Sequence, residues 1–127
     1  MARRRVVVTG LGIVSPVGIG VPQAWSSIVA GNSGITRITR FDPSGFSSQI
    51  AGEVKGFDVS QYLSAKEARR MDTFIHYGMA AAIEAIKDAG IEAKPENAER
   101  IGVNIGSGIG GLPLIEETHT EFQKSGP

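Results

Sequence analysis

A chain of 127 residues that is 41% apolar and 20% charged has the composition of an ordinary globular domain. Its 13 basic residues balance its 13 acidic ones, so no overall charge attracts it to nucleic acid or to an anionic membrane surface. The absence of cysteine excludes disulfides, thiolate metal ligands and a thiol nucleophile within these residues.

The β-branched run Val6–Val8 predicts a buried strand, and a glycine turn follows it. Gly10 and Gly12 in that turn are similar to part of the dinucleotide fingerprint, in which a helix starts at the turn and holds a pyrophosphate. Pro16 and the residues after it would prevent such a start, so nucleotide binding is not expected here.

The next elements are a helix and a loop. Pro22 suits the first turn of a helix and Gly31 the position beyond its end, which predicts a helix with Trp25 on its core face. From Gly34 to Ser48, turn-forming residues mix with apolar anchors, and we expect an ordered loop. The run from Ile50 to Val54 predicts a short edge strand or a hairpin arm.

The strongest periodic signal lies between Ser64 and Gly90. Ser64 and Glu67 form a capping box, so a helix should begin there, and Gly90 should end it. Apolar or small residues recur at helical spacing, namely Met71, Phe74, Ile75, Gly78, Met79, Ala82, Ile83 and Ile86. Because a single helix of that length is long for a small domain, a break is expected near Asp72, a possible second N-cap.

The last part of the chain predicts a strand, a glycine loop and a helix. The strand contains Ile101, Val103 and Ile105, and the loop, residues 106–111, contains four glycines. A helix should follow from Leu112 onward. This order of elements predicts an α/β layered fold with a mainly parallel sheet. We expect residues 1–127 to form a single domain segment, and we expect the fold to be incomplete in this chain.

The glycine loop also fits the dinucleotide pattern through Gly106, Gly108 and Gly111. However, the apolar residues after it, such as Leu112 and Leu114, suit an acyl tail better than a pyrophosphate. We therefore interpret the loop as a wall that lets an apolar chain approach the backbone.

The sequence contains no motif of a metal site or a serine hydrolase and no membrane span. His76 and His119 have no second ligand at metal-site spacing, so we expect no metal and no cofactor. No serine stands in the G-x-S-x-G pattern of hydrolases. No apolar run approaches the roughly 20 residues of a membrane span, and the expected location is the cytoplasm.

Lys66, Arg69 and Arg70 form a compact basic ridge along one side of the capped helix. Such a ridge can be a solvated helix face, which is what most charge runs are, or a docking site for an acidic protein. The residues by themselves leave both interpretations open.

Three stretches of the sequence carry a resemblance to a known family. They are R-R-V-V-V-T-G-L-G-I-V-S-P-V-G from Arg4 to Gly18, S-A-K-E-A-R-R-M-D from Ser64 to Asp72, and N-I-G-S-G-I-G-G from Asn104 to Gly111. The chain closely resembles the N-terminal part of the bacterial β-ketoacyl-[acyl carrier protein] synthases of type II. This resemblance implies a thiolase-like fold, a homodimer and a fatty-acid chain-elongating condensation of malonyl-acyl carrier protein with an acyl-enzyme thioester.

The resemblance also implies which residues have a role. The family's catalytic cysteine, histidines and lysine have no counterpart among residues 1–127, so no residue here is expected to be catalytic and the chain alone should be inactive. Ile109, with Gly108, resembles the part of the acyl pocket that gates a long chain. Lys66, Arg69 and Arg70 resemble the patch that docks acyl carrier protein, which favours docking over a merely solvated face.

Two explanations of the chain remain. It can be the N-terminal segment of a condensing enzyme, or a non-catalytic or split module that docks carrier protein.

Overall fold

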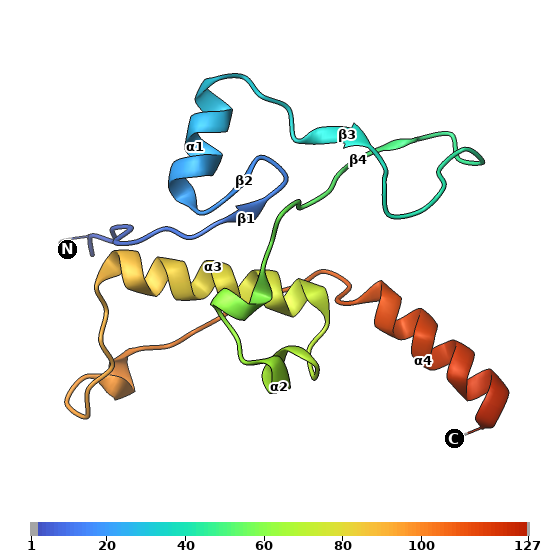
Figure 1. Ribbon diagram of the computed structural model, residues 1–127. Coiled ribbons are helices and arrows are strands. Elements are labelled where there is room, and N and C mark those ends of the chain that lie inside the picture. Colours follow the sequence, from blue (N-terminus) through green and yellow to red (C-terminus); the bar gives the residue numbers. More distant parts are fainter. Residues whose placement is uncertain (1–2, 127) are drawn as a thin grey trace. The chain divides into compact units, whose positions relative to one another are not determined.

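A computed structural model describes residues 3–126 (Figure 1). These residues form two compact units: the first contains residues 3–58 and 80–91, and the second contains residues 59–79 and 92–126. The division falls within helix α3 (Thr73–Ala89), so each unit contains one part of that helix.

The first unit begins with a short antiparallel hairpin, β1 (Val14–Ser15) and β2 (Gly18–Ile19), which leads into helix α1 (Val21–Val29). Pro22 lies in the first turn of α1, and Gly31 has a φ of 71° just after the helix. The predicted first helix is therefore confirmed, because both terminal signals act where the sequence places them.

The apolar face of α1 is exposed, contrary to the prediction that Trp25 packs in a core. Trp25 is 64% exposed, whereas the smaller Ala24 is only 2% exposed. Periodicity identifies an amphipathic helix, but burial also needs a partner surface, and within residues 3–126 that surface covers Ala24 and leaves most of Trp25 exposed.

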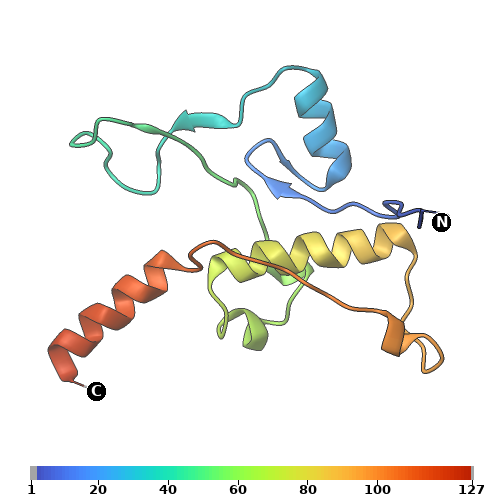
Figure 2. The ribbon, with the colours of Figure 1, turned by 180° about the vertical axis from the view of Figure 1, so that it is seen from behind.

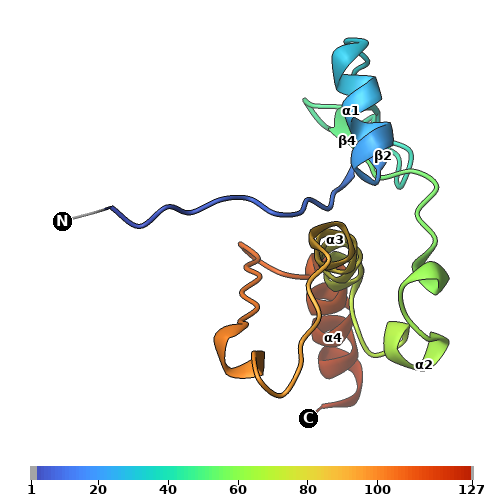
Figure 3. The same ribbon diagram turned by 90° about the vertical axis from the view of Figure 1, so that its left-hand side faces the viewer.

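Residues 3–13 form no strand, and their glycine turn packs closely on the part of α3 that belongs to the first unit (Figure 3). A Cβ built on Gly10 would lie 2.5 Å from the Ala89 nitrogen, and one on Gly12 would lie 2.8 Å from the Ala85 nitrogen. These glycines therefore allow the backbone to approach a helix, which gives the glycine turn a packing role.

Strands β3 (Ile35–Arg37) and β4 (Ile50–Gly52) form a second antiparallel hairpin, with Thr36 opposite Ala51. The hairpin arm expected at Ile50 is confirmed. In the loop between the strands, the rings of Phe41 and Phe46 pack edge to face with centroids 5.5 Å apart. The two aromatic anchors thus contact one another.

A 3₁₀ turn (Val59–Gln61) and helix α2 (Ala65–Ala68) precede α3. The capping box is present: the Glu67 N–H donates to Ser64 Oγ at 3.3 Å, and the Ser64 N–H donates to Glu67 Oε2 at 3.0 Å. Helix α3 begins after Asp72, whose Oδ1 accepts the Thr73 N–H at 2.5 Å. Both the predicted cap and the predicted break are confirmed.

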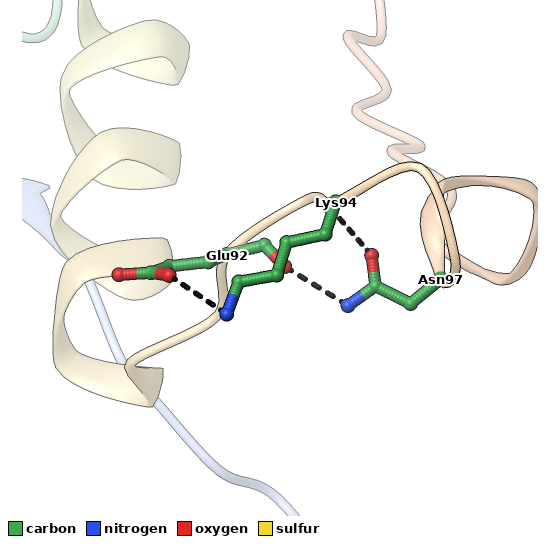
Figure 4. A network of polar contacts seen from close by, with 3 residues as sticks. All are labelled: Glu92, Lys94 and Asn97. Carbon is green, nitrogen blue, oxygen red and sulfur yellow. Dashed lines mark hydrogen bonds and ion pairs between the residues drawn. The ribbon is translucent and has the colours of Figure 1, made fainter.

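The connection after α3 is ordered by polar contacts (Figure 4). Lys94 Nζ lies 3.4 Å from Glu92 Oε2, the Lys94 N–H donates to Asn97 Oδ1 at 2.7 Å, and Asn97 Nδ2 donates to the Glu92 carbonyl at 3.0 Å. A 3₁₀ turn (Ala98–Arg100), an irregular segment and helix α4 (Leu112–Ser125) complete the second unit (Figure 2). The helix expected after the glycine loop is confirmed.

The predicted mainly parallel sheet is not formed by residues 3–126, since their two sheets are both antiparallel hairpins. Val6, Val7 and Val8 are 93, 70 and 80% exposed, and Val103 is 72% exposed. A strand forms only where a neighbour pairs with its N–H and C=O groups, and neither predicted strand has such a neighbour within the described part of the chain.

The buried core is small. Among the described residues, the buried apolar side chains are Ala24, Pro43, Leu63 and Ala80. No helix in residues 3–126 combines the length and the apolar character that crossing a bilayer requires.

Candidate functional site

The glycine loop, residues 106–111, makes a tight turn. The Gly110 N–H donates to Ser107 Oγ at 3.1 Å, and Gly110 has a φ of 86°, which favours glycine. Gly108 and Ile109 lie between these two residues and are exposed, Ile109 by 74%. The turn therefore presents one branched apolar side chain to its surroundings.

Three close approaches join this segment to the first part of α3 and to Asp72, the residue before that helix. A Cβ on Gly78 would lie 3.6 Å from Ile105 Cγ2, and one on Gly110 would lie 3.5 Å from Phe74 Cζ. At Gly111 an added Cβ would overlap the Asp72 carboxylate. Backbone and small residues thus let the loop lie directly on the helix.

An apolar hollow of about 360 Å³ lies at this junction. Its lining comes from α3, from Ile105 and from the first two residues of the loop, namely Phe74, Ile75, Gly78, Met79, Ile105, Gly106 and Ser107. The apolar lining with a single hydroxyl suits a hydrocarbon group better than a phosphate. Ile109 itself is not among the lining residues.

The basic ridge lies on α2 and on the turn that follows it. Lys66, Arg69 and Arg70 are all exposed, and none forms an ion pair with a carboxylate of residues 3–126. The nearest acid in sequence, Glu67, is engaged at the cap of α2. Hydrogen bonds from the Ser64 hydroxyl and then from its amide lower the pKa of Glu67. The three cations are therefore available to an external anion.

The two histidines lie on different helices and have separate contacts. His76 Nε2 lies 3.0 Å from the Ala68 carbonyl, so with its proton on Nε2 the ring donates a hydrogen bond that joins α3 to α2. His119 lies on α4 beside apolar side chains such as Ile115 and Phe122. Within residues 3–126, no group of three or more side chains could hold a metal ion.

Asp72 is a residue that the sequence marked only as a helix cap. It follows the basic ridge after Met71 and contacts Gly111 at the end of the glycine loop. The sequence signal was limited to an acidic residue at a helix start, because contact with a residue far along the chain leaves no local pattern. Asp72 thus follows the expected docking residues in the sequence and contacts the end of the loop that contains the expected acyl-pocket residues.

A larger hollow of about 680 Å³ belongs to the first unit and contains none of the predicted site residues. It lies beside the contact in which the Leu11 N–H donates to Asp88 Oδ2 at 2.9 Å, with the exposed Trp25 on its wall. It combines an aromatic surface with acidic groups and one lysine, Lys87, and shows no convergence of reactive groups.

Comparison with known proteins agrees with the motifs. Three relatives share the name 3-oxoacyl-[acyl-carrier-protein] synthase 2. The one from Vibrio cholerae serotype O1 is 57% identical over 127 residues, and the one from Coxiella burnetii is 49% identical over 127 residues. The one from Staphylococcus aureus is 45% identical over 124 residues. The alignments cover 100, 100 and 98% of this chain and 31, 31 and 30% of the relatives. The chain therefore spans less than a third of their length.

Solved structures give the fold. The ishigamide ketosynthase/chain length factor superposes with a TM-score of 0.77 at 32% identity, covering 98% of this chain and 31% of that one. A structure described as AntDE:AntF, a type II PKS acyl-carrier protein in complex with its ketosynthase, has a TM-score of 0.77 at 26% identity over 98% of this chain and 33% of that one. The chain thus has part of a thiolase-like fold.

Residues 3–126 match the family described as the β-ketoacyl synthase N-terminal domain. The match covers nearly the whole chain and includes the basic ridge, the glycine loop and α4. The chain belongs to the β-ketoacyl synthase family and carries its N-terminal domain segment.

Proposed function

We propose that the complete protein is a β-ketoacyl-[acyl carrier protein] synthase of type II, an acyltransferase of fatty-acid elongation. The observation that carries this proposal is the family match over residues 3–126, together with 57% identity to a relative named for that activity. The proposal extends from this segment to the whole protein.

The proposed reaction needs a nucleophile that this chain does not contain. A thiolate attacks the acyl thioester of one carrier protein and releases that carrier's thiol. Malonyl thioester then loses carbon dioxide, its methylene carbon bonds to the acyl carbonyl carbon, and the enzyme thiolate leaves. Since residues 1–127 include no cysteine, the segment alone is proposed to be inactive.

This segment is proposed to contribute two surfaces. The basic ridge docks the acidic acyl carrier protein, which its exposed and unpaired cations support. Gly108 and Ile109 are proposed to form part of the acyl pocket near a homodimer interface, which is supported by the exposure of Ile109 and by an apolar hollow that other residues of the same loop line. The proposed location of the enzyme is the cytoplasm.

The two predicted strands are proposed to complete a layered fold with a mainly parallel sheet. The exposed valines of residues 6–8 and the exposed residues 101–105 support this, because such apolar segments gain stability when neighbouring strands and helices cover them.

The test uses the complete protein with an acyl-loaded carrier protein, followed by the malonyl-loaded form. Intact mass should first show one acyl group on the enzyme, and the product should be a β-ketoacyl thioester longer by one acetyl unit. The segment 1–127 alone should show neither event. Carrier binding by the complete protein without an acyl-enzyme would overturn the catalytic proposal and support the docking module instead.

A further inference from the structure

Helix α4 begins without a side-chain cap of its own. Its N-cap is Gly111, which makes no side-chain hydrogen bond, and Pro113 follows in the first turn. The first N–H groups of a helix have no acceptor within it, and the helix dipole makes this end partly positive. An external acceptor or a negative group at Gly111 would therefore stabilise α4.

Asp72 lies at this position. A Cβ built on Gly111 would lie 2.5 Å from Asp72 Cγ and 3.0 Å from Asp72 Cβ. Asp72 Oδ1 accepts the Thr73 N–H at the start of α3, while Oδ2 is buried and has no hydrogen-bond partner among residues 3–126. One carboxylate thus stands at the N-termini of two helices, both of which favour a negative group.

We propose that Asp72 is a positioning residue, which holds the starts of α3 and α4 together and thereby sets the place of the glycine loop and of Ile109. The loop leads directly into α4, and Gly111 is at once the last residue of the loop and the N-cap of the helix. A displacement of Gly111 from Asp72 therefore moves the loop as well.

The other contacts around the loop are looser than the contact between Gly111 and Asp72. Ile105 approaches Gly78, and Gly110 approaches Phe74, at ordinary van der Waals distances of 3.6 and 3.5 Å from the added Cβ positions. Of the four glycines in the loop, only Gly111 has a neighbouring group that excludes a methyl group. We call the contact between Asp72 and Gly111 the joint. That the joint places Ile109 against an acyl chain rests on the proposed function.

The test is a double-mutant cycle in the complete enzyme. In Gly111→Ala the added methyl group must displace either the Asp72 carboxylate or the loop. We expect acylation by a long-chain acyl carrier protein to fall about tenfold more than acylation by a short-chain one, because a small misplacement at a binding site has a large effect on rate. Asp72→Ser keeps a hydroxyl to cap α3 but removes the carboxylate beside Gly111, so this variant alone should also lower long-chain acylation more than short-chain acylation. Because both substitutions disturb the same joint, the double variant should lose much less than the product of the two single losses.

Gly45→Ala is the matched control, since Gly45 lies in an exposed turn with no atom within 4 Å of an added Cβ and without a positive φ. Equal loss for long and short chains in Gly111→Ala or in Asp72→Ser would overturn the role of Asp72, as would a double variant whose loss equals the product of the two single losses. Wild-type enzyme that forms no acyl-enzyme would instead refute the proposed function, so the two failures differ.

Discussion

Glu53 orders a loop that has little apolar core. Its carboxylate accepts the Thr39 hydroxyl at 2.7 Å, the Thr39 N–H at 3.1 and 3.2 Å, and the Arg40 N–H at 3.2 Å. The hydrogen bond from the Thr39 hydroxyl, and then that from its amide, lower the pKa of Glu53 below the ordinary 4.5. One side chain therefore joins the end of β4 to the residues that follow β3.

The lowered pKa predicts a pH dependence at this loop. The folded state binds the proton of Glu53 more weakly than the unfolded state does, so the stabilisation is fully present above pH 4.5 and is lost as the pH falls through the lower folded pKa. In the complete protein, amide-exchange protection factors of Thr39 should fall over that range. Glu53→Gln should show weaker protection at neutral pH without this transition, and an identical pH profile in both proteins would contradict the prediction.

At the scale of the element, α2 shows how a very short helix can present three cations. A helix of four residues is unstable by itself, and the Ser64–Glu67 capping box supplies hydrogen bonds to its first turn. The His76 contact to the Ala68 carbonyl ties its other end to α3. The basic ridge is therefore held by defined contacts on both sides.

Reversing one charge of the ridge should weaken carrier binding. Arg70→Glu in the complete enzyme is expected to slow association with acyl carrier protein by roughly tenfold, with a smaller difference at high salt, because steering between exposed charges is screened. Stopped-flow or surface-binding kinetics would measure this. Lys124→Glu is the matched control, since Lys124 is also exposed and forms no ion pair within residues 3–126, but lies in the last turn of α4. Equal association rates of the two variants would remove docking from the ridge.

The molecule as a whole exposes more apolar surface than a stable monomer usually does. Trp25, Val103, Ile109 and Phe122 are all more than half exposed, and α4 carries an apolar groove of about 530 Å³ along Leu114, Ile115 and Phe122. Exposed apolar surface of this extent marks an interface or aggregates. If other parts of the complete protein or a second subunit cover these faces, as the proposed function implies, their apolar residues are buried in the assembled enzyme.

An isolated 1–127 chain should therefore be marginally stable. Its few buried apolar side chains contribute little against the loss of chain entropy on folding. Calorimetry should show a broad, weakly cooperative transition, and sedimentation should show self-association. A sharp two-state melt of a monomer would contradict this prediction.

Local signals in the sequence determined the helices well. The capping box at Ser64, the break at Asp72, the proline of α1 and the helix after the glycine loop are all where the pattern predicts them. Each depends on residues within a turn or two of one another, so the information is local. The motifs also identified the family, which the comparisons confirm.

The tertiary structure alone decided which surfaces meet. Periodicity predicted strands at Val6–Val8 and at Ile101–Ile105, but strand pairing is a property of two segments, and neither finds its neighbour within the described residues. The contact of Asp72 with Gly111 likewise joins residues distant in sequence. The sequence by itself determined the helices and the family, because these depend on short-range chemistry, whereas burial, pairing and the joint at Asp72 depend on long-range contacts that only the folded chain shows.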